Sequence, residues 1–237
     1  MNELVSIIVP VKNSEKTIEK LLNSFLKLRY KNIEVFVVDD NSTDKTVEIV
    51  ENFIHKNKEK IRIELLRTQG VGASACRNIG ISKTNGKFIA FTDSDCIVDE
   101  MWINELIKCF NSEDIAGAGG SQKSPDDETM FGKNVSEFME KIGFITEYIK
   151  GEDKLIYVNH NPTCNVMYRK EVFYEVGGFL EGLWPGEDVE LDLRIRRKGY
   201  KLIYNPKAIV YHYRPENLKK YCSMMKNYGK AQGYLVK

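Results

Sequence analysis

The chain has 237 residues, of which 42% are hydrophobic and 29% are charged, and its formal net charge at pH 7 is +1. This length and composition predict a single domain over residues 1–237 with a hydrophobic core of its own. The balanced charge gives no electrostatic argument for nucleic acid as a partner. No apolar run is long enough to span a membrane, and we expect no signal peptide before the first strand.

The first half of the chain alternates expected strands with expected helices. Apolar runs predict strands over 5–10, 33–38, 61–66, 87–92 and 115–119. Apolar residues at helical spacing predict helices over 14–28 and 43–55, and we also expect helices over 72–82 and 99–110. This alternation predicts an α/β fold with a mostly parallel central sheet flanked by helices.

The second half is less regular and is expected to complete the sheet. We expect helices over 131–149, 170–176 and 186–198 and from residue 216 onward, and strands over 201–204 and 208–212. The five cysteines show no C-x-x-C spacing, so the sequence predicts neither a disulfide framework nor a zinc site. A reducing, cytoplasmic location fits this cysteine usage best.

Two carboxylates, Asp93 and Asp95, directly follow the apolar strand over 87–92. Side chains two positions apart in an extended segment point to the same face, so the two carboxylates are expected to aim at one point. A proton or a cation between the two carboxylates would relieve their electrostatic repulsion, and a hard divalent ion carrying a phosphate would fit. A plain turn before the next helix is the alternative.

Polar side chains also follow the first two expected strands. The first strand ends at Pro10 and continues to Asn13, and the second ends at Asp39 and Asp40. Ligands of open α/β sheets bind beyond the carboxyl ends of the strands, where these groups are expected to converge. A turn with a helix cap at Ser42 or Thr43 is the alternative, and both roles can coexist.

A glycine-rich segment, residues 70–80, follows the third strand. It lacks the G-x-x-x-x-G-K-[ST] pattern of a P-loop, and no G-x-G-x-x-G follows the first strand, so a dehydrogenase-type fold is not expected. Arg77 in this segment could reach a phosphate or a base, and a surface ion pair is the alternative.

Taken together and in order, these pieces resemble the inverting glycosyltransferases of family 2, which have the Rossmann-like GT-A fold. The matching segments are VSIIVPVKN (5–13), VVDDNSTD (37–44), GASACRNIG (72–80), TDSD (92–95), MYRK (167–170), VGGF (176–179), GED (186–188) and LRIRRKGY (193–200). The resemblance covers nearly the whole chain. It implies a nucleotide-binding half over 1–120 and an acceptor-side half over 121–237.

The resemblance implies a nucleotide-sugar donor, with a UDP-sugar favoured, and a divalent metal, Mn²⁺ or Mg²⁺. The donor-binding residues it implies are Pro10, Asn13, Asp39, Asp40, Arg77, Asp93 and Ser94, with Asp40 holding the base and Asp39 beside it. The metal ligands it implies are Asp95, Asp93 and His212, although a packed, hydrogen-bonded His212 is the alternative. The metal would neutralise charge on the departing nucleoside diphosphate.

A second carboxylate pair, Glu187 and Asp188, is expected to act on the acceptor. The resemblance places the base that takes the acceptor's proton at Asp188, with Glu187 orienting the acceptor. Two acids in the first turn of a helix, where the dipole favours them, are the alternative. His160 and Asn161 lie in a loop that could meet the donor or acceptor, and Trp184 could stack on an acceptor ring or belong to the core.

Non-processive transfer of one sugar is expected, because the chain lacks the Q-x-x-R-W motif of the family's processive synthases. The acceptor would be a hydroxyl on a glycan or a lipid-linked carrier. The basic helix from residue 216 could contact the inner face of the membrane, or could pack on the domain as an amphipathic helix. Other functions left open are a non-catalytic module that binds sugar-nucleotides or glycans and, less favoured, a nucleotidyltransferase.

Overall fold

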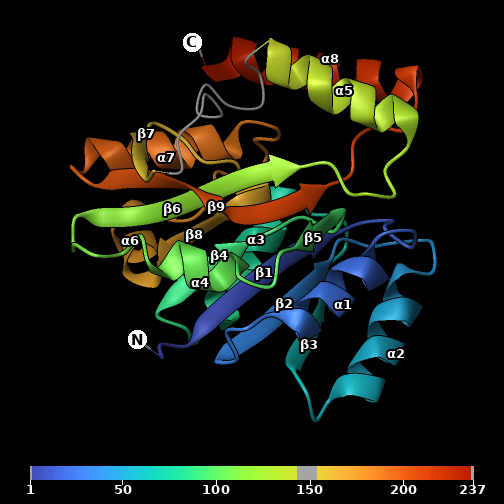
Figure 1. Ribbon diagram of the computed structural model, residues 1–237, viewed down its shortest axis with the longest axis horizontal. Coiled ribbons are helices and arrows are strands. Elements are labelled where there is room, and N and C mark those ends of the chain that lie inside the picture. The colour runs from blue at the N-terminus through green and yellow to red at the C-terminus, as the bar shows by residue number, and fades with distance from the viewer. Residues whose placement is uncertain (1, 143–153, 236–237) are drawn as a thin grey trace.

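The computed structural model describes residues 2–142 and 154–235, and its centre is one nine-stranded sheet (Figure 1). The strand order is β3-β2-β1-β4-β8-β6-β9-β5, and β7 also pairs with β9. The strands are β1 (Val5–Val11), β2 (Ile33–Asp39), β3 (Arg62–Arg67), β4 (Phe88–Phe91), β5 (Cys96–Val98), β6 (Ile115–Lys123), β7 (Ile156–Val158), β8 (Val166–Arg169) and β9 (Lys201–His212).

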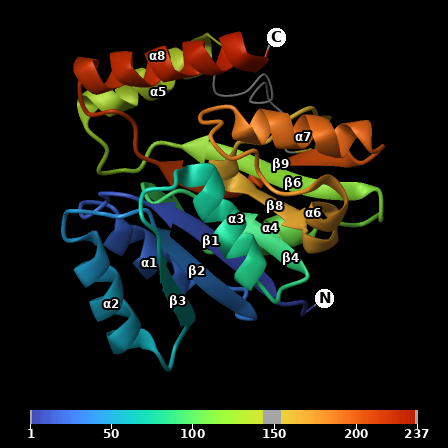
Figure 2. The ribbon, with the colours of Figure 1, turned by 180° about the vertical axis from the view of Figure 1, so that it is seen from behind.

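Helices cover both faces of the sheet (Figures 1 and 2). They are α1 (Ile18–Lys27), α2 (Thr46–Asn57), α3 (Ala73–Lys83), α4 (Trp102–Ile107), α5 (Met130–Lys141), α6 (Lys170–Val176), α7 (Glu187–Arg197) and α8 (Leu218–Leu235), with one 3₁₀ turn, η1 (Thr163–Asn165). One core cluster packs α1, α2 and α4 on the sheet, and a second packs α3, α6 and α7 on the other face. α5 and α8 lie side by side at one end of the molecule.

The strand directions confirm the mostly parallel α/β sheet that the sequence predicts. β1, β2, β3, β4, β6 and β9 run one way, whereas β5, β7 and β8 run the opposite way. β8 lies antiparallel between β4 and β6, so strands from both halves of the chain form a continuous sheet. The strand interiors are fully buried and rich in β-branched residues, as a sheet covered on both faces requires.

The register of the parallel strands aligns their carboxyl ends. Val11 of β1 is opposite Asp39 of β2, which in turn is opposite Arg67 of β3. β4 ends at Phe91, opposite Ile8 of β1, so the loop that follows it emerges at the same edge. The loops after β1, β2, β3 and β4 therefore share one end of the sheet.

Several element predictions were wrong in detail. β5, β7 and β8 were not predicted from the sequence. β9 is one strand instead of the two predicted on either side of Pro206, which lies in a bulge where the pairing with β6 shifts register between Gly120 and Ser121. A bulge tolerates the missing N–H of proline. The predicted cap at Ser42 or Thr43 is also wrong, because α2 begins at Thr46, whose backbone N–H donates to Asp44. The predicted helix over 131–149 is observed as α5, and residues 143–149 lie outside the described residues.

Candidate active site

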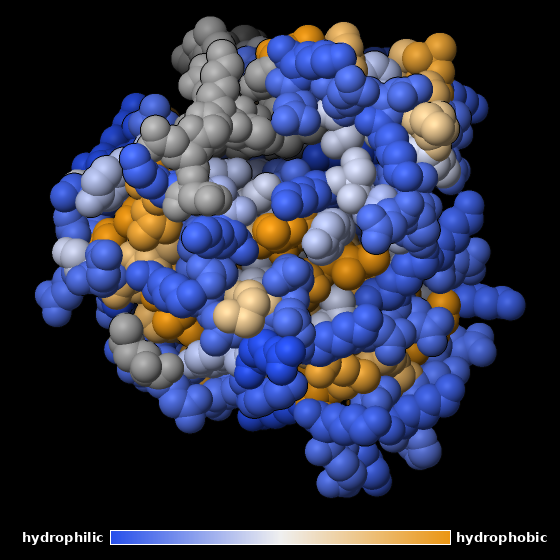
Figure 3. All heavy atoms as spheres, viewed as in Figure 1, coloured by the Kyte–Doolittle hydropathy of each residue, from blue (hydrophilic) through white to orange (hydrophobic). Residues whose placement is uncertain are grey.

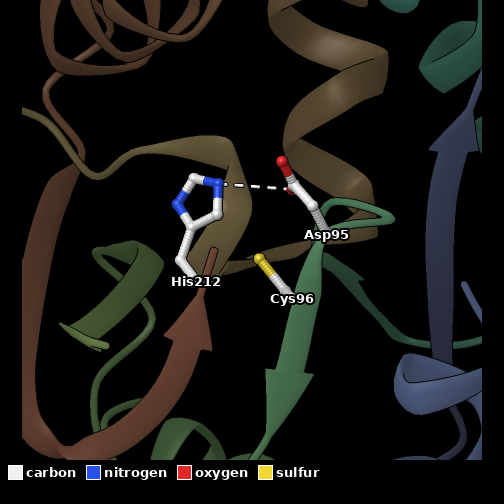
Figure 4. Close-up of side chains that lie close together, drawn as sticks. All are labelled: Asp95, Cys96 and His212. Carbon is white, nitrogen blue, oxygen red and sulfur yellow. Dashed lines mark ion pairs between the residues drawn. The ribbon is translucent and has the colours of Figure 1, made fainter. Parts of the chain in front are cut away.

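The pairing of β5 with β9 brings Asp95 and His212 together. Cys96 of β5 is opposite His212 of β9, and Asp95 immediately precedes the strand. The Nε2 atom of His212 lies 3.2 Å from Oδ1 of Asp95, and the two side chains face each other with the Cys96 thiol beside them (Figure 4). Asp95 keeps 47% of its side chain exposed, so this pair is open to solvent at the sheet edge.

The chemistry of this pair fits a divalent cation. Two ligands at right angles on an ion with bond lengths of about 2.1 Å lie about 3 Å apart, close to the observed separation. The Nδ1 atom of His212 lies 3.4 Å from both Oε1 of Gln122 and Nη1 of Arg214, and a proton directed at Gln122 would leave Nε2 free to ligate. Burial raises the pKa of the Cys96 thiol well above its usual value, so we expect oxygen and nitrogen rather than sulfur ligands here.

Arg77 joins the two carboxylate pairs. Its Nη2 atom donates to Oδ1 of Asp93 at 3.1 Å, and its Nη1 atom donates to Oε1 of Glu187 at 2.6 Å. The guanidinium is only 3% exposed and packs over the ring of Phe179, with 5.6 Å between the guanidinium carbon and the ring centroid. Both carboxylate pairs therefore border one buried cation. The surface ion pair considered for Arg77 is ruled out by its burial.

Glu187 and Asp188 begin α7, which follows Gly186 in a left-handed conformation with φ of 107°. Glu187 is buried, and burial and the Asp188 carboxylate raise its pKa to about 7 against the opposing effect of Arg77. Asp188 accepts a hydrogen bond from the backbone N–H of Thr163 at 3.3 Å and keeps part of its surface exposed. Asp188 is thus the more accessible member of this pair.

A network that the sequence analysis missed lies behind Asp188. Asp192, four residues later on α7, is fully buried and accepts a hydrogen bond from the hydroxyl of Tyr168 at 2.7 Å. Its other oxygen lies 3.0 Å from Nδ1 of His160, whose Nε2 lies 3.9 Å from Oδ2 of Asp188. The sequence does contain one indication of this network, because the i, i+4 spacing of Asp188 and Asp192 places both carboxylates on one face of a predicted helix.

Asp40 anchors the loop after β3. Its carboxylate accepts from the hydroxyl of Thr68 at 2.8 Å and from the backbone N–H groups of Val71 and Gly72 at 2.6 and 3.2 Å. Burial alone would raise the pKa of Asp40, but these donors and Lys12 lower it below its usual value. The carboxylate is therefore ionised at neutral pH and ties the glycine-rich segment to the end of β2.

Asp39 and Asn13 differ in how far their polar atoms are already engaged. Asp39 is fully buried, and its Oδ1 has no hydrogen-bond partner within residues 2–142 and 154–235. The backbone N–H of Thr43 donates to Oδ1 of Asn13, which itself has a positive φ of 52°. Asn13 thus fixes the turn after β2, and Asp39 retains a free acceptor.

Pro10 and Ser94 lie at the same edge. Pro10 is half-buried in β1 opposite Val38, and the hydroxyls of Ser94 and Ser14 lie 2.7 Å apart. The expected donor-side residues are therefore gathered at the carboxyl ends of β1, β2 and β4, with Arg77 beneath them.

Two residues considered for the acceptor differ in exposure. Asn161 is fully buried and donates to the carbonyl of Ile203, so it belongs to the core. Trp184 is 59% exposed and borders an open pocket of about 370 Å³ between the 180–185 loop and α8. The loop is held by the hydroxyl of Ser74, which donates to the carbonyl of Leu183 at 2.8 Å.

Residues 6–177, well over half of the chain, match the profile of the family described as "Glycosyl transferase family 2". The chain belongs to this family. Among curated proteins, this family 2 chain is 28% identical over 243 residues to the probable glycosyltransferase YdaM of Bacillus subtilis, covering 100% of the chain and 57% of YdaM. It is 30% identical over 210 residues to glycosyltransferase AglE of Haloferax volcanii, covering 88% of the chain and 66% of AglE. The chain thus spans less than two thirds of these relatives.

Solved structures share the fold of this family 2 chain. The mannosyltransferase PcManGT of Pyrobaculum calidifontis, in complex with GDP-Man and Mn²⁺, superposes with a TM-score of 0.72 at 20% identity, covering 90% of the chain and 58% of PcManGT. TarS 1–349 of S. aureus, in complex with UDP-GlcNAc, gives 0.68 at 24% identity, covering 90% of the chain and 59% of TarS 1–349. These likenesses confirm the GT-A fold.

Proposed function

We propose that this chain is a metal-dependent inverting glycosyltransferase that moves one sugar from a nucleotide-sugar, with a UDP-sugar favoured, to an acceptor hydroxyl. One observation carries the proposal: Arg77 bonds to both Asp93 and Glu187, which sets the 93–95 and 187–188 carboxylates around a common centre. One pair suits a metal and the other suits an acceptor, and the proposed metal-dependent transfer uses both.

On the donor side, Asp95 and His212 would hold the divalent ion, with Asp93 beside them. When bound, the ion neutralises charge on the departing nucleoside diphosphate. The partnerless oxygen of Asp39 supports a contact with an N–H of the base, because a buried acceptor without a donor is costly. Asp40 holds the loop over 68–72, which would form a wall of the same pocket.

On the acceptor side, Asp188 would take the proton of the attacking hydroxyl. The acceptor oxygen forms a bond to the anomeric carbon as the bond from that carbon to the diphosphate oxygen breaks. The acceptor O–H bond breaks in the same step, and its proton goes to the Asp188 carboxylate. Because attack comes from the face opposite the leaving group, the anomeric configuration inverts.

The acceptor would be a glycan or a lipid-linked carrier lying along the Trp184 pocket. The exposed indole offers a flat apolar face for a sugar ring, and Lys230 lines the same pocket.

None of the described helices is long and apolar enough to cross a membrane. Figure 3 shows a largely hydrophilic face with scattered apolar areas, and Met130 and Phe138 of α5 are exposed next to the lysine-rich α8. This end of the molecule would make any peripheral membrane contact.

The test is a screen of UDP- and GDP-sugars against p-nitrophenyl glycosides, with Mn²⁺, with Mg²⁺ and with EDTA. We expect transfer from a UDP-sugar that depends on the metal, and a product whose anomeric proton coupling reports inversion. A retained configuration would contradict the inverting mechanism. Release of pyrophosphate from a sugar phosphate and a nucleoside triphosphate would favour a nucleotidyltransferase instead.

A further inference from the structure

The site gathers four carboxyl groups, those of Asp93, Glu187, Asp188 and Asp192, and Arg77 bonds to two of them. Arg77 donates to Asp93 and Glu187, whereas the described contacts of Asp188 and Asp192 include the imidazole of His160. Asp192 has no exposed surface. A buried carboxylate of this kind needs a cation or several hydrogen-bond donors.

His160 occupies the position between these two remaining carboxylates. Its Nδ1 atom lies 3.0 Å from Oδ2 of Asp192, and its Nε2 atom lies 3.9 Å from Oδ2 of Asp188. The backbone N–H of Asn161 donates to the same Asp192 oxygen at 2.8 Å, and the Tyr168 hydroxyl donates to the other. Asp192 is therefore held by three donors, and it fixes the imidazole so that its free nitrogen faces Asp188.

We propose that His160, held by Asp192, is a positioning residue that acts as an imidazolium on Asp188, keeping that carboxylate in place to take the acceptor's proton. The proposal rests on the proposed function, because it assumes that Asp188 is the base. His160 and Asp192 would thus form the second cationic support of the site, on the acceptor side, as Arg77 supports the other two carboxylates.

The groups that face His160 favour its charged form. They are Asp188, Asp192 and Glu187 on α7, with Tyr168 of β8 behind Asp192. Burial alone would lower the pKa of His160, but Asp188 and Asp192 raise it to about 8. The imidazole therefore carries its second proton at neutral pH and loses it in mildly alkaline solution.

Coupling between His160 and Asp188 can be measured without substrate, because the chain has only three histidines, His55, His160 and His212. Proton NMR of the C–H signals would follow their titration, and His160→Gln would assign the signal. We expect the pKa of His160 to be near 8 in the wild type and clearly lower in both Asp188→Asn and Asp192→Asn. An unchanged His160 titration in Asp188→Asn would overturn the proposal, since coupled groups act on each other reciprocally.

The pH profile of kcat/KM is the second test. We expect kcat/KM of the wild type to decrease above about pH 8, and that of Asp192→Asn to decrease at a lower pH. In His160→Gln we expect kcat to be several-fold lower and the alkaline decrease to be absent. Tyr168→Phe is the matched control, because it removes a hydrogen bond to Asp192 but keeps the charges of His160, Asp188 and Asp192. Its kcat/KM should show the same alkaline decrease as the wild type. An unaltered profile in His160→Gln would contradict the proposal.

The two arms separate this proposal from the proposed function. A chain that transfers no sugar from any nucleotide-sugar would remove the proposed function and with it the role of Asp188 as base. The NMR titration would still report whether His160 and Asp188 are coupled. Active enzyme without that coupling would leave the proposed function intact and remove only the role of His160.

Discussion

Arg77 and Glu187 lie 110 positions apart in the sequence, yet Nη1 of Arg77 is 2.6 Å from Oε1 of Glu187 in the interior of the protein. The contact joins α3, which lies between β3 and β4 in the chain, to the first turn of α7. Because Arg77 also holds Asp93, any change at this guanidinium affects both sides of the candidate site.

Replacing Arg77 with methionine should destabilise the fold. The change leaves Glu187 buried without its cation, and breaking a buried ion pair on one side costs up to about 3–5 kcal/mol. Protonation of Glu187, whose pKa is already about 7, offsets part of this cost, so we expect the loss to be larger at pH 8 than at pH 6. Urea unfolding of Arg77→Met and of Arg77→Met/Glu187→Gln would measure this cost. We expect the double variant to be more stable than Arg77→Met, and with Glu187→Gln measured as the second single variant, additive losses would show that the pair is not coupled.

Replacing Asp188 with asparagine should remove the base with little change in structure. The side-chain oxygen of asparagine can still accept from the backbone N–H of Thr163, but it cannot take a proton at neutral pH. We expect kcat to fall about 10²–10⁴-fold, with the KM for the donor nearly unchanged. Glu190→Gln, on the same helix but paired with Arg194, is the control, and it should keep a near wild-type kcat. Full activity in Asp188→Asn would exclude this residue as the base.

His160 should make stability depend on pH. Its pKa in the folded protein is raised from 6.5 to about 8, so its contribution is fully present below pH 6.5 and is lost as the pH rises through 8. The contribution is about 2 kcal/mol for a shift of this order. Unfolding free energies at pH 6 and pH 9 should differ more in the wild type than in His160→Gln. Identical pH dependence in the two proteins would show that His160 is not stabilised in its charged form.

Trp184 should affect the acceptor and not the donor. Removing the exposed indole in Trp184→Ala takes away the proposed stacking face, and we expect the KM for the acceptor to rise while the KM for the donor stays constant. Trp184→Phe keeps an aromatic face and should retain most of the affinity. If only the KM for the donor rises, Trp184 contacts the donor and the proposed acceptor role is wrong.

Much of the fold could be predicted from the sequence, because the strand–helix alternation of the first half depends on local periodicity. β1, β2, α1 and α3 match their expected positions to within a few residues. β5 and β7 have only three residues each, and β8 only four, so their existence depends on partners far along the chain. The four-residue β4 could be predicted because it lies in the longer apolar run over 87–92, whereas β5, β7 and β8 were not recognised as strands from their short segments.

The candidate site likewise contains residues that could be predicted from the sequence and contacts that could not. The carboxylates at 93–95 and 187–188 could be singled out because they are adjacent or nearly adjacent in the sequence. The pairing of Arg77 with Glu187 and of His160 with Asp192 could not, because each contact joins segments brought together only by tertiary packing. Side-chain networks of this kind are visible only once the fold is known.

Nucleotide binding tests the central claim most directly. Isothermal titration with UDP and with GDP, each with Mn²⁺ and with EDTA, would be performed on the wild type and on Asp95→Ala, with Asp126→Ala as an exposed-carboxylate control. We predict UDP binding that requires Mn²⁺, that Asp95→Ala weakens at least about tenfold, and that Asp126→Ala leaves unchanged. Folded protein that binds neither nucleotide, or that binds UDP equally well in EDTA, would contradict a metal-dependent donor site at Asp95 and His212.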